Sequence, residues 1–129
     1  MSIVKAFNEH FDEFVSDVER AFPDDTDIAT AHTALTALRK SNPKLILTTY
    51  RDWVATPYKS QIEVGDIGFF VNKDYGGDLK EFGCGESGGA ILSKIDMLRE
   101  PVSRMNSAEQ DKVVAYHQNL TKLCWLYVS

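Results

Sequence analysis

With 129 residues, 43% of them hydrophobic and 26% charged, the chain has the size and composition of one globular domain spanning residues 1–129. A domain of this size buries roughly two-thirds of its unfolded surface, so it needs no metal and no disulfide to fold. No run approaches the ~20 apolar residues of a membrane span, and polar residues interrupt the N-terminus where a secretory signal would be apolar. We therefore expect a protein that is not secreted, with Cys84 and Cys124 reduced.

The net charge of −5 is distributed unevenly along the chain. Residues 1–27 hold eight acidic side chains against Lys5 and Arg20, whereas residues 39–59 hold five basic side chains against Asp52. A nucleic-acid-binding domain usually has a basic net charge, so this balance argues against direct binding of DNA or RNA. The two charged regions are instead candidate surfaces for a partner of opposite charge.

The first predicted helix lies between Ile3 and Phe22, where eight apolar residues recur at three- and four-residue steps. Its opposite face is acidic, which favours a helix that packs on a core over one that lies on a membrane surface. Pro23 ends this helix. The turn Asp24-Asp25-Thr26 then supplies the N-cap of a second helix, which we expect over residues 27–40.

A third helix is expected after the second, with Asn42 as its N-cap, Pro43 at its first position and Thr56-Pro57 at its end. The next apolar run, residues 62–71, fits a short helix capped by Gly65-Asp66, but it also fits a short strand. Periodicity does not separate the two at this length. We expect the helix, because no partner strand is evident elsewhere in the chain.

Residues 83–89 hold four glycines and are expected to form a flexible loop. A fifth helix follows it, and Pro101 is expected to interrupt that helix. The last helix is expected from Ser107 to about Tyr127, with Ser107 and Gln110 forming a capping box. Its apolar stripe contains Val113, Tyr116, His117, Leu120, Leu123, Cys124 and Tyr127. Together these segments predict an all-α fold, a compact bundle of five to six helices with one glycine-rich loop.

The glycine-rich segment also matches two catalytic motifs. Residues 83–88 fit G-x-G-x-x-G, which binds a dinucleotide only when it follows a strand in a βαβ unit. Residues 85–89 fit G-x-S-x-G, which needs a central sheet and a later histidine. The only later histidine is His117, and its place on an apolar stripe predicts a core residue. Both matches are therefore expected to arise by chance.

The remaining reactive side chains do not form a site in the sequence. His10 and Glu13 have the spacing of two metal ligands on a helix, but no third ligand accompanies them. His32 lies on the apolar stripe of its helix and is expected in the core. Cys84 has no cationic neighbour in the sequence that would lower its pKa. We expect no catalytic residue, no metal and no cofactor, and a protein that is not an enzyme.

Six short motifs occur in order along most of the chain. They are Phe11-x-x-Phe14, Phe22-Pro23-Asp24-Asp25, Asn42-Pro43-Lys44-Leu45-Ile46, Gly65-Asp66-Ile67-x-Phe69-Phe70, Lys73-Asp74-Tyr75 and Tyr116-x-x-Asn119-Leu120-x-Lys122-Leu123. This order resembles small, mostly uncharacterised helical proteins of large DNA viruses of algae and protists. The resemblance implies a minor, capsid-associated component of a virion, located in the particle or in the host cytoplasm or nucleus. It transfers no catalytic residue.

Two hypotheses of function follow. The first is a non-enzymatic structural or interaction protein whose partners are capsid proteins or copies of itself. The second is a nucleic-acid-associated or regulatory factor that uses the basic segment 39–59. Binding to phosphates weakens steeply with added salt, which distinguishes the second hypothesis.

The candidate partner-binding residues are the acidic side chains of the first helix and the basic side chains of residues 39–59. They are Glu9, Asp12, Glu13, Asp17, Glu19, Arg39, Lys40, Lys44, Arg51 and Lys59. Like charges at four-residue steps on a helix repel one another by a few tenths of a kcal/mol, and a basic surface would relieve this repulsion. That surface can belong to the same molecule, to another copy or to a capsid protein. The sequence leaves these three open, together with a face that is merely solvated.

Overall fold

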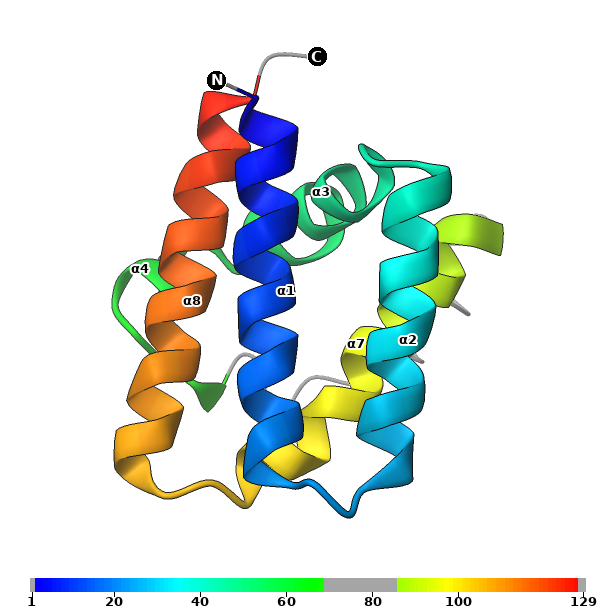
Figure 1. Cartoon of the computed structure of the whole chain (residues 1–129). Helices are drawn as coiled ribbons and strands as arrows, with labels where there is room; N and C mark the ends of the chain where they lie inside the picture. Colours follow the sequence, from blue (N-terminus) through cyan, green and yellow to red (C-terminus); the bar gives the residue numbers. More distant parts are fainter. Residues whose placement is uncertain (1, 69–85, 128–129) are drawn as a thin grey trace.

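The computed structural model describes residues 2–68 and 86–127 of the chain (Figure 1). This part of the chain contains helices and no strand, which confirms the predicted all-α fold. The elements are α1 (Ile3–Ala21), α2 (Thr26–Ser41), α3 (Leu45–Tyr50), the π-helical segment η1 (Arg51–Ala55), α4 (Lys59–Glu63), α7 (Glu86–Ser103) and α8 (Ser107–Leu126). None of the helices described is long and apolar enough to cross a membrane.

Helix α1 lies between α8 on one side and α2 on the other, and it runs antiparallel to both (Figure 1). Helix α7 packs against α2 and α3, and α4 packs against α8. The two ends of the chain lie together at the top of Figure 1, where α1 begins and α8 ends. Residues from the two ends of the sequence therefore form one surface along α1 and α8.

The core is built on the stripe of α1, as its periodicity predicts. Phe7, Phe14 and Val18 are almost completely buried, and their rings and methyl groups face α3 and α8. Tyr50 of α3 is also buried, and its hydroxyl group donates a hydrogen bond of 3.2 Å to the carbonyl oxygen of His117. This bond satisfies the one polar group that the buried tyrosine carries.

The N-cap predicted for the second helix is confirmed, and the one predicted for the third is wrong. The Asp25 carboxylate accepts the amide of Asp27 at 2.9 Å, so this turn residue begins α2. Asn42 instead ends α2, because its amide donates to the carbonyl oxygen of Leu38, and α3 begins only at Leu45. Asparagine is favourable as a cap at either end of a helix, and here it caps the end of the longer helix α2.

The segment around Gly65 begins as a helix, but earlier than the sequence predicts. Helix α4 covers Lys59–Glu63, and Gly65 follows it with φ +76°, a conformation that favours glycine after a helix end. Gly65 therefore ends one helix, and Asp66 accepts the amide of Gly68 at 2.9 Å in a new cap. Residues 69–71 of the predicted helix lie outside the described residues.

Helix α7 corrects two predictions. It begins at Glu86, so residues 86–89 of the predicted loop are helical, and residues 83–85 lie outside the described part. A glycine costs only about 1 kcal/mol in a helix, so the rest of a packed helix can impose the conformation. Pro101 lies inside α7 and does not interrupt it. It sits in the last turn, where Val102, which is fully buried, holds the backbone against the core.

Helix α8 begins as predicted, but its cap is one residue earlier. Asn106 accepts the amide of Glu109 at 2.9 Å, so Asn106 and not Ser107 is the N-cap. Gln110 does not complete a capping box; its side chain donates to the carbonyl oxygen of Val102 at 3.1 Å. That carbonyl lies in the last turn of α7, where carbonyl groups lack helical partners. Gln110 therefore ties α8 to α7.

Candidate interaction site

The acidic face of α1 divides into residues used inside the molecule and residues left on its surface. Asp12 and Glu19 both reach His32 of α2. The Nε2 atom of His32 lies 2.8 Å from an Asp12 oxygen, and the Nδ1 atom lies 2.7 Å from a Glu19 oxygen. Both nitrogens can donate to these carboxylates only when the imidazole is protonated. His32 thus joins α1 to α2, and it is not a core residue as predicted from its stripe, because it is only half-buried.

The two carboxylates also control the charge of His32. Burial opposes the positive charge, but the hydrogen bonds and the attraction of Glu19 and Asp12 outweigh it, so the pKa of His32 is raised above 6.5. No ion pair of the described part joins another cation to either carboxylate. When it is protonated, the His32 imidazole is therefore the group that neutralises this acidic pair.

This arrangement predicts a stability that falls as the pH rises. With a raised pKa, the contribution of His32 is complete below about pH 6.5 and is lost as the pH rises through the folded-state pKa. The pairs are partly exposed, so we expect a loss of less than about 1 kcal/mol. Proton NMR titration measures the pKa, and urea unfolding of the protein and of His32→Gln measures the stability. A His32 pKa at or below 6.5 contradicts this prediction.

A third acidic residue, Asp17, is also held inside the molecule. It accepts the hydroxyl group of Tyr116 on α8 and pairs with Arg20 one turn further along α1. Burial and the charge of Glu13 raise the pKa of Tyr116, while Arg20 lowers it, and the net shift is upward. Tyr116 therefore stays protonated and donates to Asp17 at neutral pH.

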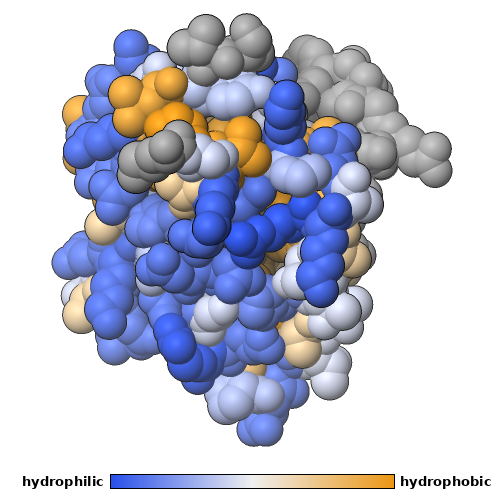
Figure 2. All heavy atoms as spheres, turned by 45° about the horizontal axis from the view of Figure 1, so that its top comes forward, coloured by the Kyte–Doolittle hydropathy of each residue, from blue (hydrophilic) through white to orange (hydrophobic). Residues whose placement is uncertain are grey.

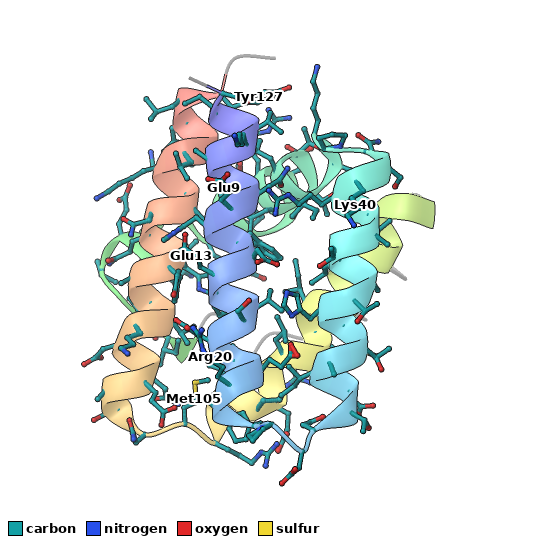
Figure 3. All side chains as sticks on the ribbon, viewed as in Figure 1. Glu9, Glu13, Arg20, Lys40, Met105 and Tyr127 are labelled. Carbon is teal, nitrogen blue, oxygen red and sulfur yellow. The ribbon has the colours of Figure 1, made fainter. Side chains whose placement is uncertain are left out.

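Glu9 and Glu13 are the predicted acidic residues that remain on the surface. Both are exposed, and neither has an ion pair within residues 2–68 and 86–127. Figure 3 shows them one above the other along α1. Their carboxylates stay available to a partner.

The predicted basic residues are more scattered. Arg51 pairs with Asp52 at 3.0 Å, and Lys59 lies over the ring of Trp125, 5.8 Å from its centroid. Lys40 and Lys44 are exposed at the end of α2 and in the turn after it. Arg39 lines a shallow hollow beside Asp12 and His32. Among the residues described, no ion pair joins the predicted acidic set to the predicted basic set, so the structure does not bring the two together within one molecule.

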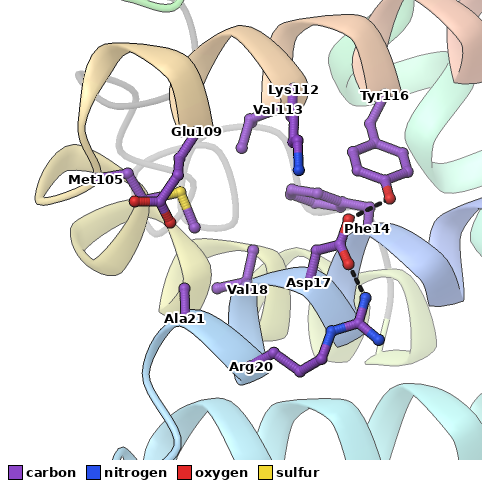
Figure 4. Close-up of a pocket in the computed structure, with 10 residues that line it drawn as sticks. All are labelled: Phe14, Asp17, Val18, Arg20, Ala21, Met105, Glu109, Lys112, Val113 and Tyr116. Carbon is purple, nitrogen blue, oxygen red and sulfur yellow. Dashed lines mark hydrogen bonds and ion pairs between the residues drawn. The ribbon is translucent and has the colours of Figure 1, made fainter.

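The structure reveals a groove between α1 and α8 that the sequence does not predict (Figure 4). One hollow of about 250 Å³ lies at the end of α1, and a second of about 240 Å³ adjoins it. They share Asp17, Lys112 and Tyr116, so we treat them as one α1–α8 groove. The first hollow is lined by Phe14, Asp17, Val18, Arg20, Ala21, Met105, Glu109, Lys112, Val113 and Tyr116, and His10, Ala115 and Asn119 join the second.

The floor of the groove is apolar and its edge is charged. Phe14, Val18 and Val113 form buried parts of the floor, and Glu109 and Lys112 stand on the α8 edge. Beside the groove, the ring of His10 contacts the ring of Tyr116 at 4.9 Å between centroids. The Nε2 atom of His10 is buried without a hydrogen-bond partner among the described atoms. Such an unsatisfied group costs about 1–3 kcal/mol, which makes it unusual in a folded protein.

A second surface lies on the other half of α8, and the sequence does not predict it either. Val64 is 79% exposed, Trp125 46% and Leu126 62%. Trp125 borders a hollow of about 250 Å³ between α4 and α8, with Glu63 and Lys122 on its edge. Figure 2 brings forward the end of the molecule where α1 begins and α8 ends, and its surface there is largely hydrophilic with one group of hydrophobic residues. We call Trp125 and Leu126, with Lys59 and Lys122 beside Trp125, the Trp125 patch.

Two groups with reactive chemistry are buried away from both surfaces. His117 is in the core, as predicted, and burial lowers its pKa to about 4 although its Nδ1 bonds the Val113 carbonyl at 2.8 Å. Cys124 is also buried, and this raises the pKa of its thiol to about 12. A neutral histidine and a protonated thiol without solvent access do not serve as base and nucleophile.

Metal binding has no support in the geometry. In the part of the chain that the structure describes, no three side chains of histidine, cysteine, aspartate or glutamate converge as ligands. The chemistry of the two surfaces is therefore that of contacts: apolar area, carboxylates and lysines. Comparisons with protein-family models, with curated proteins and with solved structures gave no match, so the resemblance to viral proteins stays a prediction.

Proposed function

We propose that this chain is a non-enzymatic interaction protein that binds a partner protein through the α1–α8 groove. The observation that carries the proposal is an apolar floor with carboxylates near it that lack ion pairs in the described part. Glu109 lines the groove together with Lys112, and Glu13 lies outside the lining but acts electrostatically on Tyr116, which lines it. A hollow of this kind accepts an apolar side chain, and the carboxylates favour basic residues around it.

The partner's chemistry follows from the groove. Its contact segment carries a large apolar side chain for the floor and lysine or arginine for Glu9 and Glu13, which are exposed on α1 outside the groove lining. Opposite charges accelerate association and orient the partner, while the buried apolar contact supplies most of the affinity. The resemblance in sequence favours a virus particle as the setting. Mass spectrometry of purified particles tests that setting: a high, stoichiometric copy number supports it, and absence from the particles contradicts it.

Neutralising the exposed carboxylates is expected to weaken partner binding. In Glu9→Gln/Glu13→Gln, the loss of two charge pairs at the surface should lower the affinity about two- to thirtyfold, since each pair contributes about 0.2–1 kcal/mol. Quantitative affinity capture from the source cells, at about 50 and about 500 mM salt, compares this variant with the unmodified protein. The unmodified protein should also lose its partner at high salt.

A matched control separates the groove from the net charge. Thr30 and Ala37 are exposed on α2, and Thr30→Lys/Ala37→Lys changes the net charge by the same +2. A partner counts only if the control retains it and Glu9→Gln/Glu13→Gln loses it. If both variants recover the same proteins in the same amounts as the unmodified chain, the acidic face is only a solvated coat and the proposal fails.

A further inference from the structure

We propose that the α1–α8 groove is occupied by the Trp125 patch of a second copy of this chain, in a head-to-tail contact. The inference rests on the proposed function, because it names the partner of the same groove. Its basis is that one molecule carries both an unfilled apolar groove, with the exposed carboxylates of α1 near it, and exposed apolar residues flanked by two lysines.

The Trp125 patch has the composition of a binding anchor. Trp125 and Leu126 are consecutive residues at the end of α8, and both are exposed, so two large apolar side chains stand in water at this end of the helix. Tryptophan is among the residues that most often dominate the energy of an interface, where it fills a pocket. Its indole ring is rigid, so burying it orders few bonds. Burial against a partner therefore contributes more binding free energy at this patch than at the charged surface around it.

The apolar hollow of the groove has the size for one such side chain. Pockets that hold drug-sized ligands measure roughly 300–1,000 Å³. The hollow over Phe14, Val18 and Val113 measures about 250 Å³, below that range. The adjoining hollow adds about 240 Å³ to the groove, so only the apolar hollow, and not the whole groove, matches one large side chain such as Trp125, which is 46% exposed.

The charges around the two surfaces are opposite. Among the residues that line the groove, Asp17 and Glu109 balance Arg20 and Lys112, so the excess negative charge on this side comes from Glu9 and Glu13, which are exposed on α1 outside the lining. Lys59 and Lys122 flank the patch, with Glu63 as the opposing charge. A patch placed in the groove would set lysines beside carboxylates, and that arrangement favours association over repulsion.

One molecule cannot fill its own groove with its own patch. The groove uses the first half of α8, around Lys112, and the patch uses its end, at Trp125. A helix rises 1.5 Å per residue, so these positions lie about 20 Å apart along one rigid element. The occupant must therefore be a second copy. Because the two surfaces differ, each copy still offers one free surface, and the contact builds a ring or an open chain.

Sedimentation velocity of the purified protein tests the inference. Between about 10 and about 500 μM at low salt, the mean mass is expected to rise at least about 1.5-fold, and added salt should reverse part of the rise. Glu13→Lys/Glu109→Lys and Lys59→Glu/Lys122→Glu should each remain monomeric. Trp125→Gln should too, with circular dichroism confirming that each variant is folded. A groove variant that associates like the unmodified protein contradicts the inference.

A mixture of the two charge-reversed variants gives the sharpest result. In the equimolar mixture, the basic groove of one variant meets the acidic patch of the other, so association should return to the level of the unmodified protein. Net charge does not explain this pattern, because Glu13→Lys/Glu109→Lys brings the protein closer to neutrality and reduces general repulsion. No recovery in the mixture, with both variants folded, overturns the head-to-tail contact.

The two proposals can fail separately. If the protein stays monomeric at every concentration but Glu9→Gln/Glu13→Gln still loses a captured partner, the groove binds another protein and this inference is wrong. If the protein self-associates and the Trp125 variant does too, a different surface makes the contact, and the inference is wrong again. If neither Glu9→Gln/Glu13→Gln nor Trp125→Gln changes the binding of any protein, both this inference and the proposed function are wrong.

Discussion

Replacing Leu120 with alanine is expected to lower the free energy of unfolding by about 2–5 kcal/mol. Leu120 is fully buried in the middle of α8, within the core that α1, α3 and α8 share. Alanine would remove apolar contacts and leave a cavity that the surrounding helices can only partly fill. Urea or guanidinium unfolding, followed by circular dichroism, measures the change.

The same helix provides the control. Leu126 is a second leucine of α8, but it is 62% exposed. Leu126→Ala should therefore change the free energy of unfolding by no more than about 0.5 kcal/mol. Both proteins should be measured at low concentration, where any self-association through Leu126 is absent. Equal unfolding midpoints for the two variants would show that the middle of α8 is not the core.

Acid is expected to destabilise the protein through His117. Its pKa is about 4 in the folded protein and 6.5 in its ordinary state, because burial disfavours the charged ring. As the pH falls from 6.5 to 4, the unfolded chain binds a proton that the folded chain excludes. The free energy of unfolding should fall by about 3 kcal/mol from this residue alone, since each pKa unit corresponds to about 1.4 kcal/mol.

The variant His117→Leu isolates this contribution. The ring packs against Phe14 at 5.1 Å between centroids and against Tyr50 at 6.1 Å, so leucine keeps an apolar group at the site. Other acid-sensitive groups act in both proteins. Between pH 6.5 and 4 the unmodified protein should therefore lose about 3 kcal/mol more than the variant. Parallel pH profiles, or an NMR titration of His117 near pH 6.5, would refute the prediction. His32 has the opposite effect, because its contribution to the free energy of unfolding is lost as the pH rises.

Local sequence patterns determined most of the helices. The stripe from Ile3 onward defines which face of α1 is buried, because residues three and four apart share one side of any helix. The same periodicity placed α2, α8 and most of the core. This periodicity depends only on residues that are close in the sequence, so the helices can be predicted without knowledge of the tertiary structure.

Tertiary packing decided the details at the helix ends. Asn42 and Pro101 carry signals that are valid for several helix positions, and their use depended on the packing of α2 and α7. Gln110 had a local capping role available, yet it bonds the Val102 carbonyl at the end of α7. Contact with a neighbouring helix thus determined which of the possible roles at a helix end each of these residues has.

Packing also decided which charged residues remain available. The sequence indicates that α1 has an acidic face, but Asp12 and Glu19 face His32 only because α2 lies against that side. Asp17 meets Tyr116 across 99 positions of the sequence, and the groove exists because α1 and α8 lie side by side. Residue spacing encodes the face of one helix. The distance between two helices depends on how all their side chains fit together. The tertiary structure alone therefore left Glu9 and Glu13 without an ion pair among the described residues and formed the groove between α1 and α8.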